Sequence, residues 1–544
     1  MTYDAVVIGA GHNGLVCAAY LARAGLSVLV LERRDELGGM AGTSELLKGV
    51  RVPTLAHTVG RLRPSIAREL GLRGHGLALV QPEVRAFAPQ PDGRAITLWG
   101  DVDRTARDLV DGGLAASSDA ASYGAADQQV RALGRGLAEL MSRIPPDLAS
   151  PTLGDAFAGL RTGLAARARA RSANESLLRT MPMAARDLVA EWFESDALRA
   201  AVAARGMLYT GLSPRMPGSG GVLLADLAGN DGGLAGQTVF ARGGPGALAD
   251  ALAAAARANG AEIRTGTAVA QVRRDGERAT GVTLTGGEEI DASVVVSNLD
   301  PRTTLLDLIE PEVLGPRLSW RAANIRQRGT TAKVNLALSG LPDFGAAAGD
   351  ARRLRGRILI APSMRYLDLA ARPAKYGELP EQPLLEATIP TLVDPGLLAD
   401  GRRGRARTVV HVMSVVVEGI PRELRDGTLD DRRDALGDAV LATLAEFAPG
   451  IAELVVERQV ITPLDVERDL GAFGGHAMHA ESSLDQWFAW RPLHGLGRYR
   501  MPLTGMYLAG SGAHPGGGVT GGPGQLAAQA VIADSRQGRL RVSA

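Results

Sequence analysis

A glycine turn at residues 9–14 is the feature that most constrains the fold of this chain of 544 residues. The short apolar run Ala5–Ile8 precedes the turn and is typical of a strand buried on both faces. Within Gly9-x-Gly11-x-x-Gly14, the first glycine allows the tight turn, the second lets a pyrophosphate approach the backbone, and the third lets helix and strand pack closely. The helix that follows offers free N–H groups and a positive dipole end to phosphate.

The sequence after this helix completes a dinucleotide-binding unit. Val28–Leu31 reads as the second strand, and Glu32 follows it, where a carboxylate accepts hydrogen bonds from both hydroxyls of an adenosine ribose. A bare GxGxxG also occurs in chance glycine-rich turns, but here the strand, helix, second strand and acid stand in the required order. The pattern therefore predicts a dinucleotide site and leaves the choice between NAD and FAD open.

Composition and charge exclude several classes of function. Hydrophobic residues make up 45% of the chain, so a sizeable core can be buried, and the length predicts two or more domains. The net charge of +1, without a long single-sign run, argues against nucleic acid as a partner. Cys17 is the single cysteine, so no disulfide, CxxC redox pair or thiolate metal cluster can form within one chain.

The sequence also predicts a cytoplasmic protein. The first strand begins by residue 4, which leaves no room for a signal peptide, and no apolar run reaches the roughly 18 residues of a spanning helix. Residues 165–171 alternate Arg and Ala, which is typical of a solvated surface helix; the alternative is a face for peripheral membrane contact. The sequence does not indicate an oligomeric state.

The distribution of strand and helix patterns predicts an α/β fold with a Rossmann-type nucleotide-binding domain interleaved with a second domain. Residues 101–235 lack strand signals and read as a helical insertion, with helices at 131–144 and 185–207 and a glycine-rich loop at 211–236. Residues 306–497 carry strands that fit a mixed-sheet substrate domain. The nucleotide-binding domain is expected to comprise residues 1–100, 236–305 and 498–544.

Regular elements can be placed in both domains from their hydrophobic patterns. In the nucleotide-binding domain we expect strands at 238–240, 263–266, 268–272, 281–284 and 292–298, and a helix at 247–259. In the substrate domain we expect strands at 334–338, 357–361, 384–391, 408–417 and 454–461, and a helix at 432–447.

A dense aromatic and polar cluster occupies residues 473–490. His476 and His479 are three apart with Glu481 near, a spacing that can ligate a metal if helical, but no further ligand is evident and the preceding Gly-Gly indicates a loop. We therefore predict no metal site. The alternatives are aromatic packing at a domain junction and an active-site wall built from His476, Met478, Trp487 and Trp490.

A second glycine-dense turn lies towards the C-terminus. Residues 505–510 read as a strand, Ser511–Gly524 as the turn, and Gln525–Asp534 as a helix. Pro523 suits a first-turn position, where its missing N–H costs nothing. Because a glycine-dense turn between strand and helix aims backbone N–H groups at an anion, the sequence predicts a second anion site here.

Several motifs, in family order and spread over nearly the whole chain, resemble those of phytoene desaturase-like FAD oxidoreductases. They are Gly9–Gly14 with Glu32 and Gly38-Gly39, Gly243–Ala249, Val295–Pro301 and Tyr507–Val519. The resemblance implies FAD as the cofactor. It implies that Gly38-Gly39 helps to hold the pyrophosphate, that Val269 pairs its backbone with the adenine edge, and that the C-terminal turn faces the flavin ring. The residues expected to bind FAD are Gly9, Gly11, His12, Asn13, Gly14, Glu32, Arg33, Gly38, Gly39, Met40, Ala41, Val269, Gly510, Gly512, Gly518 and Val519.

Residues 474–479 and 484–492 are also similar to the branch of this family that includes pyridine nucleotide-disulphide oxidoreductase domain-containing protein 2. A disulphide oxidoreductase needs a redox cysteine pair and usually a separate NAD(P) domain. This chain has one cysteine and one dinucleotide fingerprint. We therefore expect neither flavin–disulphide chemistry nor reduction of FAD through its own NADPH domain.

The resemblance implies an oxidoreductase that removes hydride from a saturated C–H bond of a small hydrophobic substrate, with oxygen or a quinone as the final acceptor. A base takes the second proton if a double bond forms, and imidazole suits that role near neutral pH. The candidates, in order, are His514, His476 and His57. His57 is expected beside the isoalloxazine ring, with a structural loop histidine as the alternative.

Three other functions stay open. The first is a redox-neutral, FAD-dependent isomerase, and the second is a flavoprotein that acts through a protein partner. The third is amine oxidation, which usually needs an aromatic cage against the flavin. Trp487 and Trp490 are the pair available for such a cage, and with Met478 they are the expected substrate contacts.

Overall fold

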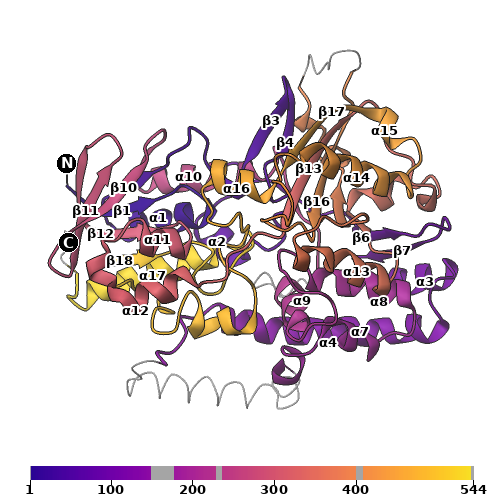
Figure 1. The fold of residues 1–544 in the computed structure, drawn as a ribbon, viewed down its shortest axis with the longest axis horizontal. Helices are drawn as coiled ribbons and strands as arrows, with labels where there is room; N and C mark the ends of the chain where they lie inside the picture. The colour runs from indigo at the N-terminus through magenta and orange to yellow at the C-terminus, as the bar shows by residue number, and fades with distance from the viewer. Residues whose placement is uncertain (1, 149–176, 228–235, 400–407, 541–544) are drawn as a thin grey trace.

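The protein, seen in a computed structural model that describes residues 2–148, 177–227, 236–399 and 408–540, is built on two large sheets that lie side by side. The sheet with the first strand lies at the left of Figure 1 together with both chain ends, and the second sheet lies at the right. The predicted fold class is confirmed. The Arg/Ala stretch at 165–171 lies outside the described residues.

The first sheet has seven strands with a parallel centre. Its order is β10-β11-β12-β1-β2-β9, and β18 also pairs with β12. β1 pairs in parallel with β2 and β12, and β12 pairs in parallel with β18. β11 is antiparallel to both β10 and β12. The strands are β1 (Thr2–Ile8), β2 (Val28–Leu31), β9 (Glu262–Arg264), β10 (Val269–Asp275), β11 (Arg278–Leu284), β12 (Glu289–Ser297) and β18 (Met506–Leu508).

This parallel centre brings three distant loops to one edge. Ala5–Ile8 is buried, as its apolar run predicts, and pairs with β2 on one side and β12 on the other. Because β1, β2, β12 and β18 are parallel, the loops after their carboxyl ends meet at the same edge of the sheet, where open α/β sheets bind ligands. The glycine turn, Glu32 and the C-terminal turn thus lie together.

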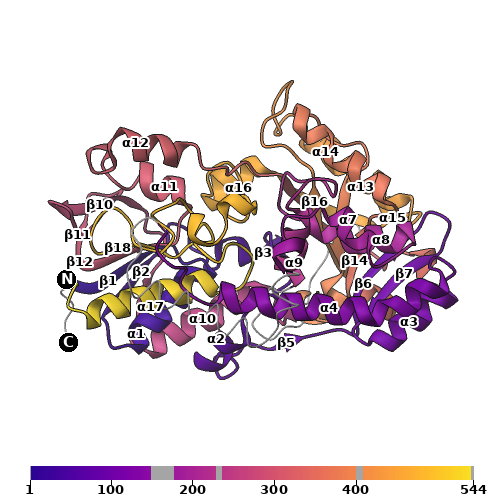
Figure 2. The ribbon, with the colours of Figure 1, turned by 90° about the horizontal axis from the view of Figure 1, so that it is seen from below.

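Helices pack around the first sheet. They are α1 (His12–Arg23), α2 (Pro64–Glu69), α10 (Gly246–Ala258), α11 (Pro301–Leu306), α12 (Pro311–Ala323) and α17 (Gly522–Arg536). In Figures 1 and 2, α17 lies along α1. A Cβ atom at Gly524 would come 2.1 Å from the carbonyl oxygen of Asn13, so glycine is what lets these two helices touch.

The second sheet is mixed and also has seven strands, in the order β17-β13-β16-β15-β14-β6-β7. They are β6 (Val84–Pro89), β7 (Ala95–Trp99), β13 (Thr331–Leu338), β14 (Arg357–Ile360), β15 (Leu384–Thr388), β16 (His411–Glu418) and β17 (Val455–Ile461). Two small ribbons complete the strands: β3 (Thr43–Leu47) with β4 (Val50–Pro53), and β5 (Leu79–Val80) with β8 (Phe240–Ala241).

Most of the remaining helices surround the second sheet, and the long α4 runs along the lower side of Figure 2. They are α3 (Val102–Asp111), α4 (Ser117–Met141), α7 (Ala185–Ala190), α8 (Asp196–Ala203), α9 (Ser219–Leu227), α13 (Met364–Ala371), α14 (Arg433–Ala445), α15 (Ile451–Leu454) and α16 (Pro463–Leu470). An apolar core joins α7, α8, α13 and α14 to the strands of this sheet.

The structure corrects three boundaries. Residues 84–99, predicted with the nucleotide-binding domain, form β6 and β7 of the second sheet, because β6 pairs with β14. The helix predicted at 185–207 is interrupted where Ser195 caps α8 through its hydroxyl. The predicted glycine loop at 211–236 contains α9, an apolar helix that is largely buried. Periodicity reveals a strand or helix but not the element against which it packs.

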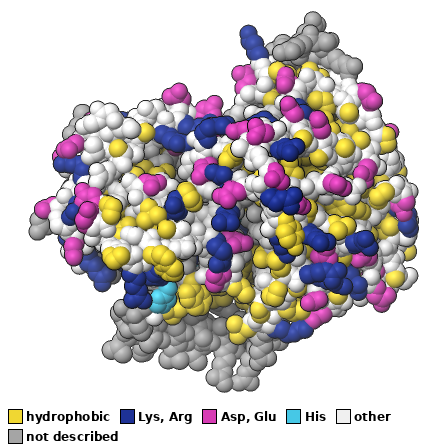
Figure 3. Space-filling model, viewed as in Figure 1, with side chains coloured by type: hydrophobic (Ala, Val, Ile, Leu, Met, Phe, Trp, Pro, Cys, Tyr) yellow, Lys and Arg dark blue, Asp and Glu magenta, His cyan; other side chains and the backbone are white. Residues whose placement is uncertain are grey.

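On the face shown in Figure 3, basic and acidic side chains are interspersed among apolar ones. Among the described residues, no helix has the length and apolar character needed to cross a membrane.

Candidate active site

One cavity runs from the carboxyl edge of the first sheet towards the second sheet. Most of the residues expected to bind FAD line it: Gly9, Gly11, His12, Asn13, Glu32, Arg33, Gly38, Gly39, Met40, Ala41, Val269, Gly518 and Val519. Gly14, Gly510 and Gly512 do not line it. Their role is close packing, since a Cβ atom would come 2.2 Å from the Gly9 oxygen, 2.5 Å from the Leu299 oxygen and 2.3 Å from Pro301 Cδ, respectively.

Glu32 is held in position at one end of this cavity. Its Oε2 accepts a hydrogen bond from the Ala10 N–H at 2.8 Å, and its Oε1 accepts one from the Arg34 N–H at 3.0 Å. The Gly38 N–H donates to the Ala10 oxygen at 2.9 Å, which joins the second glycine turn to the first. A carboxylate oriented in this way retains lone pairs for the hydroxyls of a ribose.

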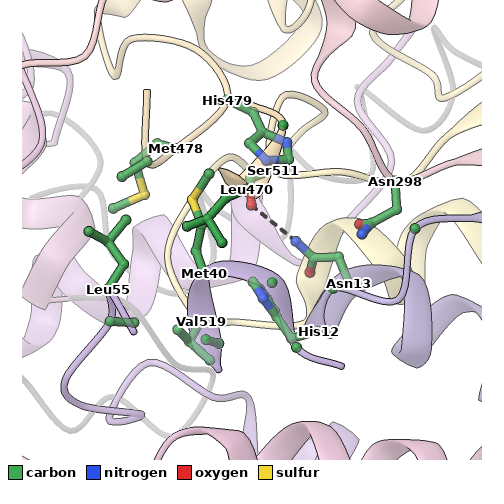
Figure 4. Close-up of a pocket in the computed structure, with 18 of the residues that line it drawn as sticks. His12, Asn13, Met40, Leu55, Asn298, Leu470, Met478, His479, Ser511 and Val519 are labelled. Carbon is green, nitrogen blue, oxygen red and sulfur yellow. Dashed lines mark hydrogen bonds between the residues drawn. The ribbon is translucent and has the colours of Figure 1, made fainter. Parts of the chain in front are cut away.

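The first glycine turn meets the C-terminal turn across the cavity (Figure 4). The Nε2 of His12 lies 3.2 Å from the Gly518 oxygen, and the Nδ2 of Asn13 donates to the Ser511 hydroxyl at 3.1 Å. Within the described part of the chain, Asn13 Oδ1 and His479 Nδ1 are buried without a hydrogen-bond partner. These unpaired polar atoms, with the glycine-lined wall, fit a polar dinucleotide such as FAD.

His514 lies away from the cavity, which corrects the leading choice of acid/base residue. Its ring is buried with its centroid 5.9 Å from that of Phe488, and its carbonyl oxygen accepts a hydrogen bond from the Tyr499 hydroxyl. Burial, with the charge of Arg63, lowers the pKa of His514 to about 3. Because this imidazole does not line the cavity, it is not placed to exchange a proton there.

The aromatic cluster at 473–490 lies only in part against the cavity. His476 is buried, does not line the cavity, and accepts a hydrogen bond on Nδ1 from the Met478 N–H at 3.0 Å. Trp490 is 45% exposed, and Trp487 packs in an apolar cluster with α4 and α9. Met478 lines the main cavity, and neither tryptophan does. Trp487 lines a smaller pocket that shares Arg61, Arg205, Tyr209, Asp226 and Met478 with the main cavity.

His57 is the one of the three predicted acid/base histidines that lines the cavity. Its Nε2 lies 3.0 Å from Oε1 of Glu386, and both side chains are buried. Burial, and then the nearby charge of Lys333, lower the pKa of His57 to about 4. Its Nδ1 has no hydrogen-bond partner among the described residues.

A charged cluster that the sequence analysis missed surrounds this pair. Arg205 donates to both oxygens of Asp226, at 2.8 and 2.7 Å, and also contacts Glu386. Burial opposes ionisation of Glu386, but Arg205, the His57 hydrogen bond and Arg357 outweigh it and hold the pKa of Glu386 well below its usual range. Arg205, Asp226, Arg357 and Glu386 all line the cavity, together with Arg61 and Tyr209.

The cluster sits on one face of the second sheet. The register places Lys333 opposite Val416, Val416 opposite Glu386, and Glu386 opposite Leu359, so these side chains share a face with Arg357, two residues before Leu359. Two polar residues two positions apart in an apolar strand, Glu386 and Thr388 in Leu384–Thr388, were the signal available in the sequence. It shows that the face is polar, but not that it lines a cavity.

Glu418 lies on the same face and provides a test of this buried environment. It accepts hydrogen bonds from the Tyr209 N–H and the Thr331 hydroxyl, and burial raises its pKa to about 8. An unfolded glutamate ionises near pH 4.3, so between about pH 4 and 8 only the unfolded state loses this proton. The free energy of unfolding should therefore fall as pH rises through this window, by up to about 1.4 kcal/mol per pH unit.

Glu418→Gln is expected to remove this dependence, because an amide mimics the protonated side chain. Thermal unfolding of both proteins at several pH values checks this: the variant should gain stability relative to the wild type as pH increases from 5 to 8. Parallel curves over that range would show that Glu418 is ionised in the folded protein.

Among the described residues, no group of three or more His, Cys, Asp or Glu side chains could hold a metal ion. Cys17 is buried in α1 as a free thiol.

Comparisons with known proteins agree with this geometry. Residues 14–360 match the family described as flavin containing amine oxidoreductase. The chain is 35% identical over 555 residues to pyridine nucleotide-disulfide oxidoreductase domain-containing protein 2 of Rattus norvegicus, covering 98% of this chain and 94% of the relative. It is 28% identical over 546 residues to hydroxyneurosporene desaturase of Cereibacter sphaeroides, covering 97% of each chain.

A similar fold is found among solved structures. A putrescine oxidase variant superposes with a TM-score of 0.60 at 17% identity, covering 99% of each chain. This likeness concerns the arrangement of the two sheets, whereas the family match concerns the sequence. The chain belongs to the flavin containing amine oxidoreductase family and is an FAD-dependent oxidoreductase.

Proposed function

We propose that this protein removes hydride from a C–H bond of a small, largely apolar molecule, a desaturation or dehydrogenation, and that oxygen or a quinone reoxidises the flavin. The observation that carries the proposal is the single cavity that joins the dinucleotide fingerprint to the buried His57–Glu386 pair. The similarity to a desaturase supports this reaction type. FAD supplies the hydride acceptor, and the protein supplies orientation and proton transfer.

We assign His57 as the base that takes the proton from the substrate. Glu386 is ionised, so it accepts a hydrogen bond, and the proton of neutral His57 therefore resides on Nε2. The lone pair of Nδ1 is then free to take a proton, and this atom has no other partner among the described residues. Glu386 also stabilises the imidazolium that forms, since its carboxylate lies 3.0 Å away.

His57→Gln should slow the reaction without emptying the cofactor site. The glutamine amide keeps a donor for Glu386 but has no basic nitrogen, so we expect the rate of flavin reduction by substrate to fall about 100-fold or more. Stopped-flow absorbance of the FAD-loaded proteins measures this rate. His75→Gln is the matched control, because His75 does not line the cavity. An unchanged rate in His57→Gln would exclude His57 as the base.

Anaerobic mixing with a panel of terpenoids, lipids and amines tests the reaction type. Stoichiometric bleaching of the flavin by a substrate is the expected result. Turnover only after prior reduction, with no net consumption of electrons, would instead establish an isomerase. If no compound in the panel affects the flavin, a role through a protein partner would replace the proposal.

A further inference from the structure

We infer that the substrate carries an oxyanion, a carboxylate or a phosphate, and that Arg357 binds it at the end of the cavity remote from the adenosine site. This inference rests on the proposed function, because it assigns the substrate class of the same cavity. At this end of the cavity, the described residues carry more buried positive charge than negative charge.

The charged end of the cavity has more cations than anions. Three arginines (61, 205 and 357) line it, against two carboxylates, Asp226 and Glu386. His57 adds no charge, since its pKa is lowered to about 4. Glu418, behind the lining, does not correct the imbalance, because its raised pKa keeps it mostly protonated at neutral pH. The remaining positive charge is expensive to bury unless an anion pairs with it.

The two carboxylates are already engaged by other groups. Asp226 is paired through both oxygens with Arg205, and Glu386 is bonded to Arg205 through one oxygen and to His57 through the other. Arg357 therefore approaches Glu386 only to 4.0 Å, between its Nε and Oε1. Among the described residues the guanidinium has no carboxylate within hydrogen-bond distance, and it shares the charge of Glu386 with Arg205.

The hydrogen bonds of Arg357 show which part of it is free. Nη2 donates to the backbone oxygens of Gly236 at 3.3 Å and Gln237 at 2.7 Å, which anchors one side of the guanidinium. Nε is buried and makes no hydrogen bond within the described chain. Burial, and then the charge of Arg205, lower the pKa of Arg357 to about 10, and the more distant charges of Glu386 and Asp226 offset this only in part. A guanidinium held in this way has a fixed orientation and keeps its Nε–H for an oxyanion.

The phosphates of FAD do not supply this anion. The glycine turns that are expected to hold them follow strands of the first sheet, whereas Arg357 begins β14 of the second sheet. Arg61 lies beside the C-terminal turn, which is expected to face the flavin, because a Cβ atom at Gly518 would come 2.6 Å from its Nη1. Lys333, fully buried on the same sheet face as Arg357, has no hydrogen-bond partner of its own in the described part. Burial lowers the pKa of Lys333 to about 7, so it adds only part of a positive charge at neutral pH.

A second pocket indicates the rest of the substrate. It shares Arg205, Gly236, Arg357 and Glu386 with the main cavity and extends between the second sheet and the inserted helices. Its other lining is mostly apolar and includes Leu98, Tyr123, Val130, Phe193 and Leu223. The site thus suits a molecule with an apolar body and one oxyanion, rather than a pure hydrocarbon or an amine.

Four probes of equal chain length test this inference: octanoate, octyl phosphate, octanamide and octylamine. Isothermal titration calorimetry of the FAD-loaded protein measures their affinity without requiring turnover, and the flavin absorbance reports whether they reach the cavity. We expect one of the two anions to bind at least about 30-fold more tightly than the amide and the amine, and the stronger anion identifies the oxyanion.

Arg357→Gln should abolish this preference while the protein keeps its FAD, and Arg357→Lys should restore part of it. Arg353→Gln is the matched control, because Arg353 lies on the same segment and pairs with Asp108 away from the cavity. If the wild-type protein binds the amide or amine as tightly as the anions, or binds neither anion, the inference is overturned. This comparison does not depend on any variant folding.

The experiments distinguish failure of the oxyanion site from failure of the proposed function. If the protein prefers an anion but no compound bleaches the flavin, the oxyanion site is supported and the proposed dehydrogenation is contradicted. If a neutral hydrocarbon bleaches the flavin at equal rates in the wild type and in Arg357→Gln, the dehydrogenation is supported and the oxyanion site is contradicted.

Discussion

Gly11→Val is expected to purify without FAD, the largest effect that the structure predicts. A Cβ atom at position 11 would lie 2.8 Å from Nδ2 of Asn298, and the branched side chain would extend into the space that the pyrophosphate needs. Gly11 also forms a backbone bridge with Gly38, so it lies where the two glycine turns meet. The ratio of flavin absorbance to protein absorbance in the purified protein measures the loss.

Gly286→Val is the matched control for this substitution. Gly286 lies in the turn between β11 and β12, where a Cβ atom would have nothing within 4 Å of it, so FAD content there should equal that of the wild type. Circular dichroism of both variants separates loss of the cofactor from loss of the fold. A Gly11→Val protein that retains full flavin content would contradict the assignment of this turn to the pyrophosphate.

Glu386→Gln is expected to cause the largest loss of stability. The substitution removes the carboxylate that compensates Arg205 and Arg357, and leaves both guanidinium groups more strongly unbalanced in a buried site. Removing one partner of a buried ion pair typically costs about 3–5 kcal/mol. For a protein of this size, we expect the midpoint of thermal unfolding of the FAD-loaded protein to fall by roughly 5 °C or more.

The pH dependence identifies the cause of this loss. The folded-state pKa of Glu386 is depressed, so its contribution to stability is present above the unfolded value near 4.3 and disappears as pH falls below it. The difference between wild type and Glu386→Gln should therefore narrow on acidification. Glu83→Gln, which removes a largely exposed ion pair with Arg104, should cost at most about 1 kcal/mol. Equal losses in the two variants would argue against a buried network.

Much of the fold could be predicted because its signals are local. The first strand, glycine turn, helix and second strand follow one another in the sequence, and their apolar periods differ clearly. The pairing of β6 with β14 could not be predicted, since more than 250 residues separate Ala86 from Arg357 in the sequence and neither strand encodes its neighbour. For the same reason, the prediction that β8 belongs to the nucleotide-binding domain does not reveal that it pairs with β5 in a separate ribbon.

The two ends of the candidate site also differ in how far the sequence predicts them. The adenosine end can be predicted residue by residue, because Gly9, Gly11 and Glu32 belong to one contiguous motif that lines the cavity. The other end combines Arg205 and Asp226 from the inserted helices with Arg357 and Glu386 from two strands. Each of these residues is ordinary in its own segment, and only tertiary packing makes it part of a site.

His514 illustrates the same limit within a recognisable motif. It stands in the glycine-rich C-terminal turn, which makes it the first choice of acid/base residue from the sequence, but it does not line the cavity. A motif fixes the path of the backbone, whereas the direction of one side chain depends on what packs around it, here Phe488.

The contact between the first glycine turn and the C-terminal turn has a consequence for biosynthesis. His12 and Asn13 meet Gly518 and Ser511, residues about 500 positions later in the chain. During translation the fingerprint leaves the ribosome early, yet its wall is completed only when the strand–turn–helix around Gly518 has been made. Contacts of such long sequence separation form late in folding. We therefore expect FAD to bind after translation is complete. Until then the edge of β1 that pairs with β12 stays exposed on the nascent chain, and β18 later pairs with β12.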